Sequence, residues 1–266
     1  MFIKAAELAN NVELNLNNFN NNNDFNHLID IDPDRNDVNQ QPNCFNVDPS
    51  NLLQIPLADN IFSVMSLNIS SLKSIFLYPQ LEITDHFRPS VIGICETKIT
   101  NEIETLYNIA GYNMFTNDNQ SDKGGVALYL KNSIPVMVKP AQTIIRNGIE
   151  TIFADLNTPS GIITVGLVYK RSVAISTENL SISLEEIISS LDPKIKTYIM
   201  GDFNINLFDN STSQPVNFFL NLMISRNYYP TITRPTRVTP ICTLIDNIFC
   251  NRIDEIVNWS NNHKHI

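Results

Sequence analysis

The stretch TYIMGDFNINL, residues 197–207, decides the fold and the candidate site of this chain. Its first residues are aromatic, β-branched or otherwise apolar, which predicts a short buried strand that ends near Gly201. Asp202 and Asn204 follow, and side chains two positions apart on an extended chain point to the same side, so both can contact one ligand. Aspartate accepts protons and carries charge, whereas asparagine can donate a hydrogen bond to a phosphate oxygen. The alternative is an Asx turn that closes the strand.

Polar side chains also end or interrupt four other apolar runs. They are Asn68 in IFSVMSLNI, Glu96 in SVIGICETKI, Tyr169 in GIITVGLVYK and Asp246 in CTLIDNIFC. Burying such groups without partners costs about 1–3 kcal/mol each, so convergence on a shared ligand is the economical explanation. A Glu and an Asp around one cleft suit a hard cation such as Mg²⁺. The structural alternatives are a turn residue for Asn68, an exposed acid for Glu96, a strand aromatic for Tyr169 and a hydrogen-bonded core carboxylate for Asp246.

The pattern of apolar residues predicts an alternation of strands and helices from residue 61 onward. Strands are expected over 61–69, 90–99, 124–131, 151–157, 161–170, 197–204 and 242–250. Helices are expected over 71–87, 180–191 and 215–226, the first of them broken or kinked at Pro79.

Composition and charge bound the class of protein. The chain has 266 residues, of which 43% are hydrophobic and 17% charged, and it has no apolar run of about 18 residues that could span a membrane. Its first residues, MFIKAAELANNVELNL, lack the apolar core of a secretory signal, which favours an intracellular protein, nuclear or cytoplasmic. The net charge of −9 lies mostly in the first 55 residues, which hold eight acidic and two basic side chains. The charge of the remaining part neither supports nor excludes a nucleic-acid partner.

The first 56 residues differ in kind from the rest. They are rich in asparagine and show no sustained period of 2 or 3.6, so we interpret them as a mostly disordered leader, with a short helix over 3–16 as a weaker alternative. A single domain is expected over 57–258, followed by a tail at 259–266.

The order and spacing of several motifs resemble the endonuclease/exonuclease/phosphatase family. The motifs are SLNISSL, ICET, GGVALYLK, VYKRS, YIMGDFNINL and RPTRVTPICTLIDNIF. More narrowly they are similar to the endonuclease domain of LINE-type non-LTR retrotransposons, over about residues 60–255. The resemblance implies an α/β fold, the DNase I-like four-layer α/β/β/α sandwich. It also implies an enzyme that cleaves phosphodiester bonds with Mg²⁺ or, alternatively, Mn²⁺. It also implies a monomer that binds DNA, with no membrane and no small-molecule cofactor.

The resemblance also assigns roles to residues. Glu96 matches the metal-binding glutamate, and Asn68 matches the asparagine beside it. Tyr169 matches the tyrosine that contacts the phosphate, and Asn204 matches the asparagine that bonds the scissile phosphate. Asp202 matches the aspartate that positions or deprotonates the attacking water.

Two further matches and one absence concern the end of the domain. Asp246 matches the aspartate that orients a catalytic histidine, and Thr236 lies in the matching substrate-facing segment. The Ser-Asp-His motif that carries the family's histidine is absent, because His263 and His265 lie in NNHKHI without an aspartate before either. We therefore expect the final core strand to be missing as well.

Two functions from different classes remain. The first is a Mg²⁺-dependent endonuclease that nicks target DNA for reverse transcription and is weak or inactive without the histidine, whose general acid–base help is typically worth 10² to 10⁴ in rate. The second is a non-catalytic retroelement remnant or weak nucleic-acid-binding module. A phosphomonoesterase on the same fold is a third alternative, which the LIDNIF and GGVALYLK segments disfavour.

Overall fold

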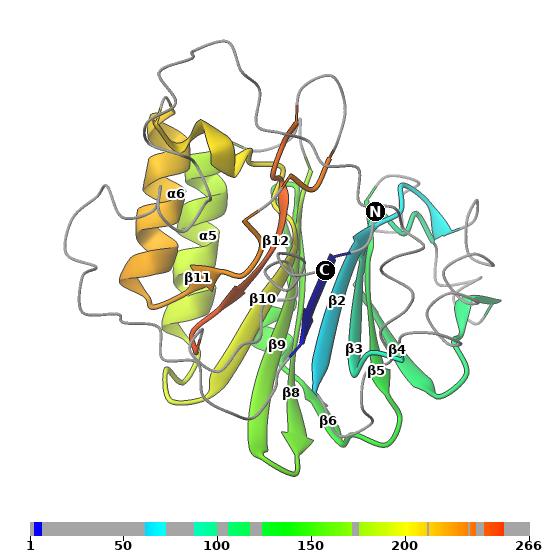
Figure 1. The fold of residues 1–266 in the computed structure, drawn as a ribbon. Helices are drawn as coiled ribbons and strands as arrows, with labels where there is room; N and C mark the ends of the chain where they lie inside the picture. The colour runs from blue at the N-terminus through cyan, green and yellow to red at the C-terminus, as the bar shows by residue number, and fades with distance from the viewer. Residues whose placement is uncertain are drawn as a thin grey trace, which may run out of the picture.

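The strands of the protein form two mixed sheets that lie side by side, with two helices over one of them (Figure 1). The computed structural model describes residues 3–6, 62–72, 88–99, 106–117, 124–171, 176–211, 213–233, 235–237 and 242–252. In this part of the chain, no helix is both long and apolar enough to cross a membrane.

The first sheet has five strands. Their spatial order is β1 (Ile3–Ala6), β2 (Ser63–Asn68), β3 (Val91–Cys95), β5 (Val126–Lys131) and β4 (Tyr112–Asn117). β2 and β3 are parallel, and the other neighbouring pairs are antiparallel. Both β2 and β3 therefore end at the same edge, which is where Asn68 and Glu96 are found.

The second sheet contains the strand of the GDFN segment at its centre. Its order is β11 (Tyr229–Pro230), β12 (Asp246–Cys250), β10 (Lys196–Asp202), β9 (Gly161–Lys170), β8 (Ile149–Thr158) and β6 (Val136–Val138), with β7 (Ile145–Arg146) also paired to β8. In this register Asp202 on β10 lies opposite Tyr169 on the parallel β9 and opposite Asp246 on the antiparallel β12. Pairing of the strands thus brings three of the predicted site residues into one row.

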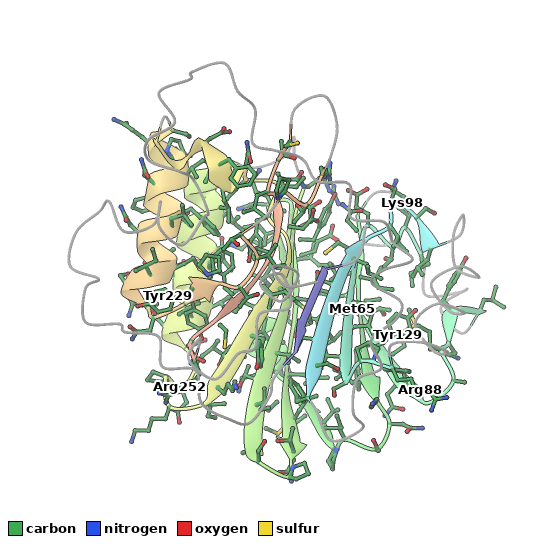
Figure 2. All side chains as sticks on the ribbon, in the orientation of Figure 1. Met65, Arg88, Lys98, Tyr129, Tyr229 and Arg252 are labelled. Carbon is green, nitrogen blue, oxygen red and sulfur yellow. The ribbon has the colours of Figure 1, made fainter. Side chains whose placement is uncertain are left out.

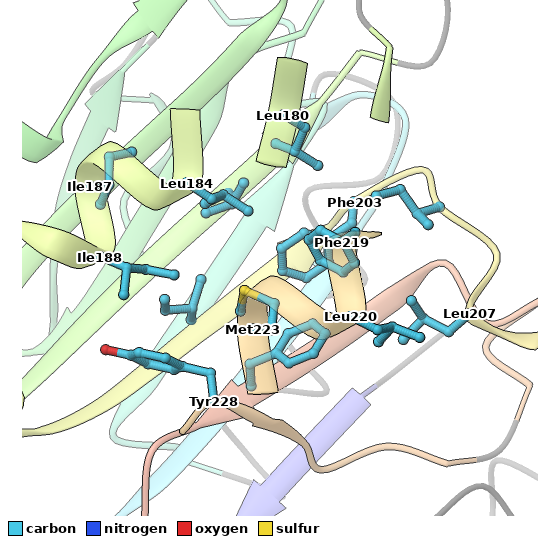
Figure 3. Packing of buried hydrophobic residues seen from close by; sticks show 14 of the residues in the cluster. Leu180, Leu184, Ile187, Ile188, Phe203, Leu207, Phe219, Leu220, Met223 and Tyr228 are labelled. Carbon is cyan, nitrogen blue, oxygen red and sulfur yellow. The ribbon is translucent and has the colours of Figure 1, made fainter. Parts of the chain in front are cut away.

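Helices α5 (Thr177–Ser189) and α6 (Gln214–Ser225) cover the second sheet, and the short 3₁₀ helices η4 (Pro140–Gln142) and η5 (Leu207–Ser211) lie in its connections. The core beneath the helices is centred on Phe203, Phe219 and Phe249, whose ring centroids are 5.3 to 5.7 Å apart (Figure 3). Aromatic rings at these separations pack at tilted and edge-to-face angles, so the two helices are fixed against β10 and β12.

Both faces of the first sheet are buried. Val64 belongs to a core that includes residues of both sheets, such as Leu128 and Tyr198, whereas the neighbouring Met65 packs with Tyr129 on the opposite face. Met65 and Tyr129 are 1% and 0% exposed, and Figure 2 places both within the first sheet. This alternation is the period of two that a strand requires.

Most of the expected elements are confirmed. Each expected strand overlaps an observed strand, and the helices expected over 180–191 and 215–226 correspond to α5 and α6. Strand β1 is a correction, because Ile3–Ala6 pair with β2 instead of beginning a helix, while the rest of the leader lies outside the described residues. The helix expected over 71–87 and the tail also lie largely outside them. The chain beyond 252 lies outside them too, so the expected absence of the final core strand stays a prediction. Over the described residues the observed fold is therefore α/β, with two mixed sheets and two α-helices.

Candidate active site

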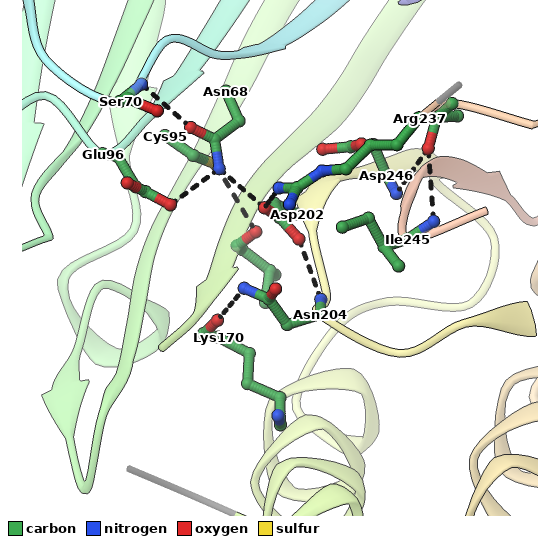
Figure 4. A network of polar contacts seen from close by, with 12 residues as sticks. Asn68, Ser70, Cys95, Glu96, Lys170, Asp202, Asn204, Arg237, Ile245 and Asp246 are labelled. Atoms are coloured by element: carbon green, nitrogen blue, oxygen red, sulfur yellow. Dashed lines mark hydrogen bonds and ion pairs between the residues drawn. The ribbon is translucent and has the colours of Figure 1, made fainter. Parts of the chain in front are cut away.

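Six of the seven predicted site residues gather at one end of the two sheets (Figure 4 shows five of them). Asn68 ends β2, Glu96 follows β3, Tyr169 lies next to the end of β9, Asp202 ends β10, Asn204 follows it and Asp246 begins β12. Because parallel strands end at a common edge, positions that are far apart in the sequence share one location. Figure 4 shows Asn68 pointing from the first sheet toward Asp202 of the second.

The Asn68 amide joins two carboxylates. Its Nδ2 donates to Glu96 Oε1 at 2.8 Å and to Asp202 Oδ2 at 2.7 Å, and its Oδ1 accepts from the Ser70 backbone N–H at 3.0 Å. The Ser70 N–H can only donate, so this bond fixes which end of the amide carries the oxygen. Asn68 is thus a hydrogen-bond donor between the sheets, and its oxygen is turned away from the carboxylates where a metal ligand was expected.

Asp202 is held by three donors. The side chain is 1% exposed, its Oδ1 accepts from the Asn204 backbone N–H at 2.9 Å, and its Oδ2 accepts from Asn68 and from Arg237 Nη2 at 3.1 Å. Burial raises the pKa of Asp202, and the hydrogen bonds of Asn68 and Asn204 and the charge of Arg237 act in the opposite direction. The carboxyl group is therefore fixed in position and has a higher proton affinity than an exposed aspartate.

Two site residues have strained backbones. Glu96 has φ of 58° and Asn204 has φ of 47°, in the left-handed region that costs most non-glycine residues about 1–3 kcal/mol. The loop of Glu96 is held by the backbone bonds of Thr97 N to Gly125 O at 3.1 Å and of Lys98 N to Gly124 O at 2.9 Å. Such conformations persist where neighbouring contacts impose them, and they cluster at functional sites.

The side chains of Asn204 and Tyr169 border the carboxylates. Asn204 Nδ2 donates to the Lys170 carbonyl at 2.6 Å, which leaves its second amide hydrogen for another acceptor. Burial, followed by the charges of Glu96 and Asp202, raises the pKa of Tyr169. The phenol is therefore protonated at neutral pH, and its hydroxyl has no hydrogen-bond acceptor among the described residues. Both groups can donate to an anion.

Thr236 orients Asp246 from the interior. Its side chain is 0% exposed, its hydroxyl oxygen accepts from the Ile245 and Asp246 backbone N–H groups at 3.2 Å each, and it is hydrogen-bonded to the Asp246 carboxyl group. The hydroxyl is therefore engaged below the surface, and the expected contact of Thr236 with a substrate stays a prediction.

Asp246 makes stability depend on pH. Burial, followed by the charge of Asp202, raises its pKa from 3.8 to about 6, so between pH 4 and 6 the folded protein retains a proton that the unfolded chain has lost. The free energy of unfolding should therefore decrease as pH rises through this range, and Asp246→Asn should reduce that decrease to the part that Asp202 contributes. Urea midpoints at pH 4.5, 5.5, 6.5 and 7.5 measure the effect. Equal pH slopes in the wild type and in Asp246→Asn would contradict it, with the exposed Asp192→Asn as the control.

Sequence reasoning missed Arg237. It lies next to Thr236 in RPTRVTP, and its guanidinium forms an ion pair with Asp202 at 3.1 Å (Figure 4). The only signal in the sequence is a basic residue beside a predicted site residue. The four histidines, His27, His86, His263 and His265, all lie outside the described residues.

The carboxylates suit a hard cation in part. Glu96 is 21% exposed in its side chain, and its Oε2 lies 3.8 Å from Lys98 Nζ, the nearest cation in the part of the chain that the structure describes. The described residues hold no cluster of three or more His, Cys, Asp or Glu side chains. Mg²⁺ commonly binds to one or two carboxylates and takes its other ligands from water and substrate phosphate, so Glu96 with its neighbour Asp202 fits such an ion.

Comparison of the sequence with protein families finds one match. The sequence model described as Endonuclease/Exonuclease/phosphatase family matches residues 65–262. The search of curated proteins finds no match.

Solved structures share the fold at low sequence identity. The endonuclease domain of TRAS1, a telomere-specific non-LTR retrotransposon, has a TM-score of 0.54 and 15% identity, covering 70% of this chain and 84% of that one. An AP endonuclease from Archaeoglobus fulgidus has a TM-score of 0.53 and 12% identity, covering 71% and 86%. A 3'-5' exonuclease from Neisseria meningitidis has a TM-score of 0.52 and 14% identity, covering 70% and 86%. Each aligns over more than two thirds of this chain.

Proposed function

We propose that this chain, which belongs to the endonuclease/exonuclease/phosphatase family, is a Mg²⁺-dependent DNA endonuclease of the kind that nicks target DNA for reverse transcription. The observation that carries the proposal is the Asn68 amide, which joins Glu96 of one sheet to Asp202 of the other. A bridge of this kind holds a candidate metal ligand and a candidate base at fixed separation, and preorganisation of charged groups is what phosphoryl transfer requires.

The residues divide the work of hydrolysis. Asp202 holds the attacking water and accepts its proton, because its buried carboxyl group has a raised pKa and its Oδ1 keeps a lone pair beyond the Asn204 bond. Tyr169 and the second amide hydrogen of Asn204 donate to the phosphate oxygens as their negative charge grows. A Mg²⁺ ion held by Glu96 would neutralise part of the charge on the phosphate.

The retrotransposon task rests on the motif order and on the fold. LIDNIF and GGVALYLK, together with GDFN, follow the pattern of such endonuclease domains, and the TRAS1 endonuclease domain has the same fold.

A non-catalytic DNA-binding module is the second candidate. The observation that favours it is the ion pair of Arg237 with Asp202, which occupies an oxygen of the proposed base. In that case the site would hold a phosphate without cleaving it.

Nicking of supercoiled plasmid by the full chain tests the proposal. Conversion to open circles with Mg²⁺, lost on addition of EDTA, is the expected result. Binding to the plasmid without conversion at any Mg²⁺ or Mn²⁺ concentration would favour the binding module instead.

Glu96→Gln should raise the Mg²⁺ concentration that nicking requires. The amide keeps an oxygen for the Asn68 bond but removes the negative charge that a hard cation needs, so we expect at least about a tenfold higher Mg²⁺ concentration for half-maximal rate. Rate is measured over a Mg²⁺ titration, and Mg²⁺ binding is measured by calorimetry without DNA.

Glu178→Gln is the matched control for this experiment. Glu178 is exposed in the first turn of α5, and its replacement should leave both measurements unchanged. Mg²⁺ affinity that is equal in the wild type and in Glu96→Gln would exclude Glu96 as the metal ligand.

A further inference from the structure

The site gathers more negative than positive charge. Glu96, Asp202 and Asp246 bring three carboxyl groups to one end of the sheets, and a bound phosphodiester would add a further negative charge. Among the described residues, two cationic side chains form ion pairs with this group: Lys98, 3.8 Å from Glu96, and Arg237, 3.1 Å from Asp202. Only Arg237 is within hydrogen-bonding distance, so it is the cation most tightly coupled to the proposed base.

Arg237 extends from a fixed piece of backbone. Its N–H donates to Thr243 O at 3.0 Å and its carbonyl accepts from Thr243 N at 3.1 Å, which makes an isolated antiparallel bridge. The neighbouring Thr236 is anchored to Asp246. The backbone from which the guanidinium reaches Asp202 is therefore held in position by the same contacts that orient Asp246.

The Arg237 guanidinium has N–H donors beyond the one that bonds Asp202. An arginine carries five N–H donors in a planar fork, and within the described residues Asp202 is the hydrogen-bonding partner of the Arg237 side chain. The side chain is 45% exposed, although Asp202 beneath it is buried. One edge of the fork thus faces the proposed base, and the rest is accessible from the solvent side where a substrate would arrive.

We propose that Arg237 is a further catalytic residue of this site, whose guanidinium donates to the phosphate being cleaved while it remains bonded to Asp202. The inference rests on the proposed phosphodiester hydrolysis. Planar bidentate recognition of phosphate is the geometry in which arginine is strongest, and the bond to Asp202 would hold the phosphate next to the water that Asp202 activates.

The role of Arg237 is electrostatic. In hydrolysis the water oxygen forms a bond to phosphorus, its proton passes to Asp202, and the bond from phosphorus to the leaving oxygen breaks. Arg237 stabilises the negative charge that develops on the non-bridging oxygens. It cannot supply the proton that the leaving oxygen needs, because guanidinium does not deprotonate in proteins, so that proton comes from solvent water.

The test compares Arg237→Ala and Arg237→Lys with Arg146→Ala. Arg146 is a matched control, because it also forms an ion pair of 3.1 Å, with the exposed Glu186. Two substrates are used with each full-length variant: supercoiled plasmid and bis(p-nitrophenyl) phosphate, a diester whose phenolate leaves without a proton. Affinity for a fluorescent DNA duplex is measured separately in EDTA, where no cleavage occurs.

Arg237→Ala should lower kcat/KM by about 10² to 10³ on both substrates, since removing one oxyanion donor commonly has that effect. Arg237→Lys should recover part of the loss through its charge, and Arg146→Ala should behave as the wild type. Thermal melts of all variants should agree within a few degrees. A lower kcat/KM on plasmid but not on bis(p-nitrophenyl) phosphate would mean that Arg237 contacts a distant part of the DNA backbone, which would overturn the proposal. An Arg237→Ala variant with unchanged kcat/KM on both substrates would overturn it too.

The outcomes separate this inference from the proposed function. If the wild type binds the duplex but cleaves neither substrate, hydrolysis fails and the catalytic role fails with it, while weaker duplex binding by Arg237→Ala alone would still support a phosphate contact. A wild type that cleaves, with Arg237→Ala equally active, would leave hydrolysis standing and remove Arg237 from it.

Discussion

Asp202→Asn is expected to abolish plasmid nicking, with a rate at least about 10² to 10⁴ below that of the wild type. The amide has the same shape as the carboxyl group but cannot take a proton from the attacking water. In the wild type the two oxygens of Asp202 accept hydrogen bonds from Asn204, Asn68 and Arg237. The change also replaces one of these oxygens with an NH₂ group, which cannot accept them. Proton transfer from the attacking water and the hydrogen-bond network of Asp202 should therefore both be lost. The measurement is single-turnover nicking at saturating Mg²⁺.

The loss of nicking in Asp202→Asn is informative only if this variant folds as the wild type does. Near-ultraviolet circular dichroism should report the same aromatic packing in Asp202→Asn, because the core of Phe203, Phe219 and Phe249 is not altered by the change. Asp192→Asn, at an exposed aspartate of the connection into β10, should nick as the wild type does. Residual nicking above about a tenth of the wild-type rate in Asp202→Asn would mean that another group activates the water.

The position of the site could be predicted because its signal is local. An apolar run that ends in a polar residue marks the end of a buried strand, and Asn68, Glu96 and Asp202 all follow that pattern. The register that sets Asp202 between Tyr169 and Asp246 follows from strand pairing over long sequence separations, for which the chain offers no local pattern. Individual positions could thus be named from the sequence, but their arrangement required the fold.

Side-chain direction was the part that could not be predicted. The metal contact expected of Asn68 stays a prediction, and the orientation of its amide depends on the Ser70 backbone N–H, which only the turn after β2 positions. Arg237 was missed because its contact with Asp202 depends on the bridge to Thr243. Strands β4 and β6 were missed for a different reason, since both are partly exposed, β4 mixes polar with apolar residues and β6 has only three residues.

Gly201→Ala is expected to destabilise the protein by at least about 4 kcal/mol, which is exceptional for one methyl group. Gly201 has φ of 145°, and a Cβ atom there would lie 1.8 Å from the Val168 carbonyl oxygen of β9. The collision is with backbone in the middle of two paired strands, so it cannot be relieved by a side-chain rotation. Urea denaturation followed by far-ultraviolet circular dichroism measures the loss of stability.

Gly161→Ala separates the two causes of this expected loss. Gly161 also has a left-handed backbone, with φ of 119°, but a Cβ there meets nothing within 4 Å, so its replacement should cost only the conformational strain of about 1–3 kcal/mol. The difference between the two variants is the cost of forcing β10 away from β9. Because Asp202 follows Gly201 and lies opposite Tyr169, that same displacement should reduce nicking even under conditions where Gly201→Ala is folded. Equal stability of the two variants would show that the strands can separate without loss, and that the GDFN glycine is required for its backbone angle alone.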